Sequence, residues 1–310
     1  MSKITVIGAG SVGATIANDL MVQGIASEIV LIDINKEKAF GEALDIYQAA
    51  PFCSPAIVRC GDYPDATDSD IVVITSGVAR KPGQSRLDLA QTNVNILKDI
   101  TPNIVKVAPK AVYIIVSNPV DILTYIALKE SGYPANRVIG SGTVLDTGRF
   151  RYELGEHLGV DSRSVHAYII GEHGDSELAA WSDARVGGLK ISDFCELRGH
   201  FNHEDSMTRI FDHVKNSAYE IISKKHATYY GIAMAVVRIC SAIVRDEKSI
   251  MPVSSLMTGE YGLYDVVLSI PAVVDANGIE TVVPIELSET ELLALKKSAD
   301  ILKDILKDNV

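Results

Sequence analysis

Residues 3–13 read Lys3-Ile-Thr-Val-Ile-Gly-Ala-Gly-Ser-Val-Gly13, and this stretch decides the fold. Its apolar first half predicts a buried strand over residues 3–8, and the pattern that follows predicts a helix to about Gln23. A second strand is expected over Glu28–Ile32, ending at Asp33. Together, the strand, glycine-rich turn, helix and second strand predict the first unit of a parallel sheet with crossover helices.

The turn carries its glycines in the order G-x-G-x-x-G, which is typical of dinucleotide-binding sites in this structural context. Gly8 allows a tight turn, Gly10 lets the backbone approach a pyrophosphate, and Gly13 lets the helix pack against the strand. Because a helix N-terminus carries partial positive charge, the phosphates are expected there. We therefore predict a cofactor site at Gly8, Gly10, Ser11, Val12 and Gly13. The alternative interpretation is a glycine-rich turn that binds no ligand.

The charge of Asp33 distinguishes between the two nicotinamide dinucleotides. Asp33 follows Gly13 at about 20 residues, the position from which an acidic side chain binds the adenosine ribose hydroxyls. A 2′-phosphate at the same place would meet a like charge. The predicted cofactor is therefore NAD.

Strands and helices continue to alternate through the first half of the chain. Further strands are expected over residues 56–60, 70–76, 112–116 and 136–139, and helices over residues 36–49 and 87–107. The alternation predicts an α/β fold with a doubly wound parallel (Rossmann) sheet. Ligands of such sheets bind at the carboxyl ends of the strands, and there the sequence places further cofactor-binding candidates, Thr75, Gly77, Ser117 and Asn118.

Composition argues against several functional classes. The chain has 29 Lys and Arg against 40 Asp and Glu, a net charge of −11, so nucleic acid and anionic membranes are not expected as partners. No apolar stretch is long enough to predict a membrane span, and the N-terminus lacks a signal-peptide pattern. The four cysteines lack CxxC spacing. We expect no metal site and a reduced, cytoplasmic setting.

A basic loop over residues 77–86 follows the fourth predicted strand. It carries Arg80, Lys81 and Arg86 and has no apolar anchors. We interpret it as a lid that closes over an anionic ligand. The alternative is a solvated basic loop.

A histidine stands out in the second half, within Ile170-Gly-Glu-His-Gly-Asp-Ser-Glu177. The apolar run over residues 165–170 predicts a buried strand that leads into it. His173 lies between two glycines and beside carboxylates, and such an imidazole is suited to donate or accept a proton near neutral pH. The alternative is a polar turn whose histidine only caps the strand.

A helix expected to begin near Val144 carries Asp146 and Arg149 on one face, because they are three residues apart. One interpretation is that the two side chains form a surface ion pair. The other is that both are functional, with Asp146 orienting His173 and Arg149 binding a carboxylate of the substrate. A hinge-like link at 140–143 divides the chain into a nucleotide-binding domain, 1–143, and an α+β substrate domain, 144–310. In the second domain we expect helices over 203–225, 227–246 and 288–307, and strands over 251–257 and 266–271.

The chain resembles the L-lactate/malate dehydrogenase family over nearly its whole length. The matching motifs are Gly8–Gly13, Asp33, Arg86, Ser117-Asn-Pro119, Asp146-Thr-Gly-Arg149 and Gly171-Glu-His-Gly-Asp175. Two motifs are most similar to those of bacterial family members that act on L-lactate, namely Glu172–Glu177 and Ala227-Thr-Tyr-Tyr-Gly231. The resemblance implies that His173 donates a proton to the substrate carbonyl, that Asp146 orients it, that Arg149 binds the substrate carboxylate and that Arg86 polarises the carbonyl.

The remaining matches concern the substrate and regulation. Asn118 and Thr228 match residues that contact substrate, and Asn118 also matches a nicotinamide contact. Arg80 matches malate-specific members, since lactate-specific members carry glutamine there. Arg151 and His166, in contrast, match the pair that binds fructose 1,6-bisphosphate at a subunit interface in allosteric lactate-specific members. We predict the reduction of pyruvate to L-lactate in a homotetramer. The first alternative is the dehydrogenation of malate or of another L-2-hydroxy acid, and the second is a non-catalytic NAD-binding sensor.

Overall fold

The computed structural model describes residues 2–78 and 86–309, and for residues 86–89, 308 and 309 only the backbone. Arg80 of the predicted lid lies outside the described residues. Arg86 is described by its backbone alone, as the first residue of a helix.

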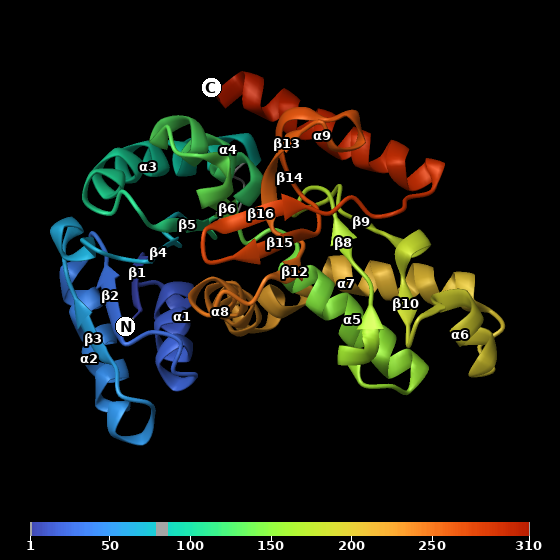
Figure 1. The fold of residues 1–310 in the computed structure, drawn as a ribbon, viewed down its shortest axis with the longest axis horizontal. Coiled ribbons are helices and arrows are strands. Elements are labelled where there is room, and N and C mark those ends of the chain that lie inside the picture. Colours follow the sequence, from blue (N-terminus) through green and yellow to red (C-terminus); the bar gives the residue numbers. More distant parts are fainter. Residues whose placement is uncertain (1, 79–85, 310) are drawn as a thin grey trace.

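A large sheet crosses the molecule in the order β14-β13-β6-β5-β4-β1-β2-β3 (Figure 1). Strands β1 to β6 are parallel, whereas β13 and β14 are antiparallel additions from the second half of the chain. The predicted doubly wound parallel sheet is confirmed, with the winding reversed between β1 and β4. The strands are β1 (Lys3–Ile7), β2 (Glu28–Ile32), β3 (Ile57–Cys60), β4 (Ile71–Ile74), β5 (Val112–Ile115), β6 (Val138–Gly140), β13 (Ser254–Thr258) and β14 (Tyr264–Ser269).

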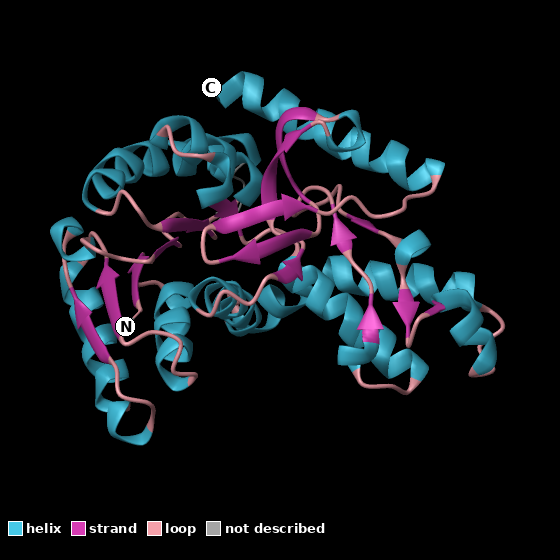
Figure 2. Cartoon of the chain, viewed as in Figure 1, coloured by secondary structure: helices cyan, strands magenta, loops and turns pink. Residues whose placement is uncertain are grey.

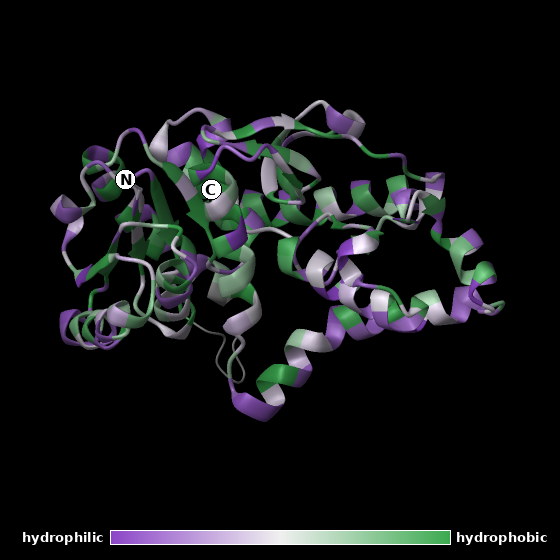
Figure 3. Cartoon of the chain, turned by 60° about the horizontal axis from the view of Figure 1, so that its bottom comes forward, coloured by the Kyte–Doolittle hydropathy of each residue, from purple (hydrophilic) through white to green (hydrophobic). Residues whose placement is uncertain are grey.

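Helices cover both faces of this sheet (Figure 2). One face packs against α1 (Ser11–Val22), α2 (Lys36–Gln48) and α8 (Tyr230–Val244), and the other against α3 (Arg86–Val107), α4 (Val120–Ser131) and α9 (Glu289–Asn309). Strands covered on both sides are apolar on both sides, and every residue of β4 and β5 is buried. The strands of the large sheet are accordingly coloured as hydrophobic in Figure 3.

The second half adds a smaller layer of short strands and helices beside the large sheet (Figure 1). Phe150 lies at the centre of its apolar core and stacks edge-on against Trp181. Its helices are α5 (Val144–Leu158), α6 (Ile191–Leu197) and α7 (His203–Lys225). Its strands are β7 (Val165–His166), β8 (Ile169–Ile170), β9 (Leu178–Ala179), β10 (Arg185–Val186), β11 (Leu189–Lys190), β12 (Ser249–Met251), β15 (Ala272–Asp275) and β16 (Gly278–Val282).

Two of the strands expected from apolar runs are wrong, because each is two strands in different sheets. The run over 165–170 divides into β7, which pairs with β10, and β8, which pairs with β9. Between them the carbonyl of Ala167 accepts from Arg151 Nε (3.0 Å) instead of from a neighbouring strand. The run over 251–257 divides at Pro252, which has no N–H to donate to a ladder, into β12 and β13.

The sequence analysis also missed helix α4. Its residues from Val120 to Leu128 are all buried, so the helix has no polar face and lacks the periodicity that identifies an amphipathic helix. The predicted helix over 227–246 is shorter at both ends and forms α8.

The two halves of the chain are closely combined. Helix α8 packs on α1, and α9 packs on α3 and α4, so each face of the parallel sheet is covered partly by the second half. The domain boundary at residue 143 remains a prediction. Within the described residues, no helix combines the length and the apolar character needed to cross a bilayer.

Candidate active site

At Gly8 and Gly13, the turn between β1 and α1 packs tightly against neighbouring protein atoms. Gly8 has φ +107°, and a Cβ there would lie 2.5 Å from Thr75 Oγ1. A Cβ at Gly13 would lie 1.8 Å from the carbonyl oxygen of Gly8, whereas a Cβ at Gly10 would meet no atom of the described residues within 4 Å. The open space at Gly10 is where a ligand can approach the backbone.

The N-terminus of α1 has the character of an anion site. Gly10 is its N-cap residue, none of the described side chains caps the helix, and the first turn contains no acidic residue. The N–H groups of Ser11, Val12 and Gly13 belong to this first turn and have no partner within the helix. They fit the pyrophosphate of a dinucleotide.

Asp33 follows β2 at the same edge of the sheet. Its Oδ2 accepts from the N–H of Ala9 (2.6 Å) and its Oδ1 from the N–H of Asn35 (2.8 Å). A carboxylate offers about four acceptor positions, so these bonds fix its orientation and leave capacity for hydroxyl donors. The side chain is half-buried, and its contact with a ribose stays a prediction.

Asp33→Ser is expected to raise the affinity for NADPH relative to NADH by about tenfold, because removing one charge relieves repulsion of the 2′-phosphate. The ratio of dissociation constants, measured by fluorescence titration with both nucleotides, checks this. Asp45→Ser removes the same charge from an exposed position on α2 and serves as the control. An unchanged ratio in Asp33→Ser would mean that the ribose is bound elsewhere.

The other cofactor candidates lie after β4 and β5, next to the reversal of the winding. Thr75 Oγ1 donates to the carbonyl of Gly8 (3.0 Å), and Ser117 Oγ donates to the carbonyl of Ser76 (2.6 Å). These two hydroxyls therefore hold the three strand ends together. Asn118 precedes a cis peptide bond to Pro119 and is exposed.

Asn93 is a residue of this region that the sequence analysis missed. It is buried on α3, where its Oδ1 accepts from the N–H of Val78 (2.8 Å) and its Nδ2 donates to the carbonyl of Asn118 (2.7 Å). It thereby joins the segment after β4 to the segment after β5. The available signal was a polar residue between Ala90 and Val94 on an otherwise buried helix face.

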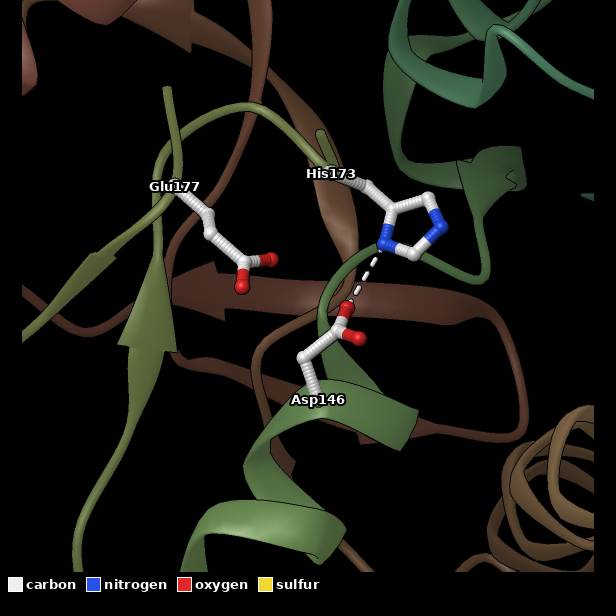
Figure 4. A group of neighbouring side chains, drawn as sticks. All are labelled: Asp146, His173 and Glu177. Atoms are coloured by element: carbon white, nitrogen blue, oxygen red, sulfur yellow. Dashed lines mark hydrogen bonds and ion pairs between the residues drawn. The ribbon is translucent and has the colours of Figure 1, made fainter. Parts of the chain in front are cut away.

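His173 and Asp146 come together although 27 residues separate them in the sequence. His173 Nδ1 lies 2.6 Å from Asp146 Oδ2, and the other ring nitrogen points away from Asp146 and Glu177 (Figure 4). The side chain of Asp146 is 4% exposed and that of His173 is 25% exposed. The arrangement leaves Nε2 as the nitrogen that can exchange a proton with a ligand.

Helix α5 is placed against the His173 segment by hydrogen bonds at its N-terminus. Thr147 Oγ1 accepts from the N–H of Ile169 (2.9 Å), and Thr143 Oγ1 donates to the carbonyl of the same residue (2.5 Å). Ile169 belongs to β8, which leads into the loop of His173. The two threonines therefore set the position of Asp146 relative to the imidazole.

Arg149 lies on the other side of Asp146. Its Nη1 donates to Asp146 Oδ1 (2.9 Å), and its side chain is 16% exposed. A guanidinium has five N–H donors, so this bond leaves several for a carboxylate ligand. The structure thus brings His173, Asp146 and Arg149 into one group.

The charges in this group favour a protonated imidazole. Burial lowers the pKa of His173, but the charge and hydrogen bond of Asp146, together with Asp121 and Glu177, raise this pKa to about 9. Burial opposes ionisation of Asp146, yet His173 and Arg149 hold the pKa of this carboxyl below its ordinary value. Burial and the charge of Asp146 raise the pKa of Glu177 to about 8.

Three groups that often bind metals therefore meet here with their ligand atoms within 4.8 Å of one another: Asp146, His173 and Glu177. A metal requires a neutral imidazole, whereas this one is held in its charged form, with Nδ1 already bonded to Asp146. Proton transfer suits the group better than metal binding.

The remaining candidates among the described residues are Thr228, Arg151 and His166. Thr228 is half-buried in the segment between α7 and α8. Arg151 Nε donates to the carbonyl of Ala167 (3.0 Å), and its guanidinium lies 4.9 Å from the ring centroid of Tyr168. His166 is exposed on β7, next to the residue that Arg151 contacts.

Comparison with known families gives a match in each half of the chain. Residues 2–140 match the lactate/malate dehydrogenase NAD-binding domain, and residues 143–310 match the lactate/malate dehydrogenase alpha/beta C-terminal domain.

Known proteins resemble the chain over nearly its full length. An L-lactate dehydrogenase of Thermoanaerobacter pseudethanolicus is 53% identical over 308 residues, 99% of each chain. L-lactate dehydrogenase 1 of Clostridium acetobutylicum is 51% identical over 305 residues, 98% of this chain and 97% of its own. The ligand-bound crystal structure of a minor L-lactate dehydrogenase from Enterococcus mundtii superposes with a TM-score of 0.96 at 44% identity, covering 99% of this chain and 98% of that one.

Proposed function

The chain belongs to the lactate/malate dehydrogenase family, and we propose that it catalyses the reversible, NADH-dependent reduction of pyruvate to L-lactate. The observation that carries this proposal is the bond from His173 Nδ1 to Asp146 Oδ2 at 2.6 Å, with Arg149 on the other carboxylate oxygen. The full-length similarity to L-lactate dehydrogenases favours pyruvate over oxaloacetate as the substrate.

In this proposal, His173 Nε2 donates a proton to the carbonyl oxygen of the substrate as negative charge develops there. Asp146 holds Nδ1 and stabilises the imidazolium. Arg149 binds the substrate carboxylate with nitrogens that are not bonded to Asp146. When bound, reduced nicotinamide supplies the hydride for the carbonyl carbon.

The cofactor and the rest of the substrate are assigned to residues on the surrounding strand ends. Gly8, Gly10 and the first turn of α1 hold the pyrophosphate, and Asp33 holds the ribose. Thr75, Gly77, Ser117 and Asn118 surround the nicotinamide half. Arg86, Asn118 and Thr228 complete the substrate site, with Arg86 stabilising the developing oxyanion.

Oxidation of NADH in the presence of a panel of 2-oxo acids tests the proposal. Pyruvate is expected to give the highest kcat/KM, with oxaloacetate second and 2-oxo acids with larger side chains below both. If NADH binds but none of the acids is reduced, the chain is a nucleotide-binding sensor and the proposed activity is wrong.

Arg80→Gln is expected to raise the pyruvate-to-oxaloacetate ratio of kcat/KM, because an arginine can pair with the second carboxylate of oxaloacetate. A charge-assisted hydrogen bond contributes about 1.5–3 kcal/mol, which corresponds to roughly ten- to a hundredfold in preference. Lys81→Gln on the same loop is the control. A parent enzyme that prefers oxaloacetate a hundredfold would instead make malate dehydrogenation the function, and a ratio that Arg80→Gln leaves unchanged would place Arg80 away from the substrate.

Arg151 and His166 are proposed to bind fructose 1,6-bisphosphate, with the arginine contacting a phosphate. The effector is expected to lower KM for pyruvate or to favour the tetramer, and His166→Ala is expected to abolish the effect. Arg163→Gln, an exposed arginine paired with Asp161, should keep the response. Steady-state kinetics and light scattering measure both effects, and a parent enzyme indifferent to the effector in both would remove the site.

The proposed assembly is a homotetramer in the cytoplasm. Three apolar side chains one helical turn apart are exposed on α2, namely Phe40, Leu44 and Tyr47, and exposed apolar patches of this kind mark association surfaces. All four cysteines are free thiols, in keeping with a reducing compartment.

A further inference from the structure

Asp121 is a buried carboxylate that contacts the loop of His173. It lies in the first turn of α4 and is 2% exposed. Its Oδ2 accepts from the backbone N–H of His173 (2.7 Å), and its Oδ1 accepts from Ser254 Oγ (2.6 Å). Both oxygens are therefore bonded, one of them to the main chain of the residue that carries the imidazole.

The second of these bonds continues into a polar network between the two halves of the chain. Ser269 Oγ lies 3.3 Å from Ser254 Oγ and accepts from the N–H of Thr143 (3.1 Å). The main chain of Ser269 exchanges two hydrogen bonds of 2.9 Å with Gly171. Asp121 thus connects α4, strands β13 and β14, and the segment from Gly171 to His173.

Charge is the second consequence of this placement. Burial raises the pKa of Asp121 to about 6, although the bonds from Ser254 and His173 and the imidazolium charge oppose the rise. Asp121 is therefore largely ionised at neutral pH. The other titratable or charged groups around the pair are Asp146 and Arg149 on α5, Glu172 and Glu177 on the loop itself, and Lys215 on α7.

We propose that Asp121 is a positioning residue for the proton donor. Its carboxylate holds the main chain of His173 so that the ring meets Asp146, and its negative charge adds to that of Asp146 in favouring the protonated ring. This inference rests on the proposed role of His173 as proton donor.

The test is Asp121→Asn, a change that keeps the shape and removes the charge. Loss of a neighbouring anion is expected to lower the pKa of His173 by about one unit. The NMR titration of the histidine Cε1–H signals measures it directly, and the signal missing from His173→Asn identifies His173 among the seven histidines. The alkaline limb of kcat/KM for pyruvate should move by the same amount, and kcat at pH 7 should fall by about 10- to 100-fold through misplacement of the ring.

Two further variants separate this role from a general loss of structure. Asp265→Asn removes a carboxylate that binds Tyr125 and Lys129 of the same helix α4, and it should leave the titration of His173 unchanged. Ser254→Ala keeps the charge of Asp121 but removes one bond that holds it, so kcat should fall while the titration stays near the parental curve. This variant also tests the positioning role if Asp121→Asn does not fold.

A folded Asp121→Asn with the parental titration of His173 would overturn the electrostatic role. Parental kcat in both Asp121→Asn and Ser254→Ala would overturn the positioning role. Because the NMR titration needs no turnover, it also tests Asp121 in a chain that fails to reduce pyruvate, and only the proposed function would then be wrong.

Discussion

His173→Asn is expected to lower kcat for pyruvate reduction by about 10²–10⁴-fold, because it removes general acid catalysis at the carbonyl oxygen. Binding of NADH should stay near the parental value, since the nucleotide turn between β1 and α1 is built from other residues. Stopped-flow and steady-state kinetics measure kcat, and fluorescence titration measures the dissociation constant of NADH.

The dependence of kcat/KM on pH provides a second test of His173 as the proton donor. The pKa of His173 is raised to about 9, and the proton donor acts only when protonated. The kcat/KM for pyruvate reduction is therefore expected to fall as pH rises through about 9, whereas lactate oxidation, which needs the neutral ring, should rise over the same range. His173→Asn should lack this alkaline limb.

A second histidine–carboxylate pair provides the control. His213 on α7 is 53% exposed, and its Nδ1 lies 3.1 Å from Glu153 Oε1. His213→Asn removes a comparable pair outside the group of His173, Asp146 and Arg149, and its kcat should match that of the parent. A His173→Asn enzyme with near-parental kcat would exclude His173 as the proton donor.

Gly13→Ala is expected to weaken NADH binding by about 100-fold or more. The added Cβ would lie 1.8 Å from the carbonyl oxygen of Gly8, and since both partners are backbone, either β1 or α1 must shift. A shift of the α1 N-terminus breaks charge-assisted bonds to the pyrophosphate, each of which contributes about 1.5–3 kcal/mol. Overpacking of this kind also lowers the free energy of unfolding by about 1–3 kcal/mol. NADH titration and urea unfolding at matched protein concentration measure the two effects.

Gly10→Ala separates the ligand contact from the structural one. Its Cβ would meet no atom within 4 Å in the part of the chain that the structure describes, so the free energy of unfolding should change by less than about 0.5 kcal/mol. The methyl group instead fills the space through which the pyrophosphate approaches, and the dissociation constant of NADH should rise about tenfold. Parental NADH binding by Gly10→Ala would place the pyrophosphate elsewhere.

The strand–turn–helix geometry of the proposed nucleotide site could be predicted because the pattern that identifies it lies within one short stretch of sequence. Gly8, Gly10 and Gly13 have a fixed spacing within a single strand–turn–helix unit, and each has a separate steric reason to be glycine. The acid at the end of the next strand, Asp33, follows at a constant distance. The structure shows close approaches at Gly8 and Gly13 and a hydrogen bond between Asp33 and Ala9, whereas the contacts of these residues with a dinucleotide stay a prediction.

The residues around His173 were only partly predictable. Asp146 and Arg149 share a helix face, a local relation, and their motif drew attention to them. Asp121 and Asn93 act through contacts made by folding, and in the sequence they are single polar residues among buried apolar ones. The single acidic residue in the apolar run from Val120 to Leu128 indicates a buried carboxylate. This interpretation requires knowing that the run is a buried helix.

Strand boundaries failed where hydrogen-bond partners, and not hydrophobicity, decide them. The run over residues 165–170 is apolar enough for one strand, yet β7 and β8 pair with different partners. The same holds for β12 and β13 on either side of Pro252. Hydrophobic periodicity reports burial and gives no information about which sheet a strand joins.

The covering of the parallel sheet by α8 and α9 has a consequence for how the protein is made. Chains fold as they leave the ribosome, N-terminal segments first, but the helices that complete both faces of this sheet lie after residue 229. Until they emerge, the nascent sheet presents apolar faces and the unpaired edge of β6 to the surrounding solution. Such contacts between distant segments slow folding and favour aggregation. We therefore expect the newly made first half to depend on chaperones during synthesis, and a chain stopped at residue 143 to precipitate.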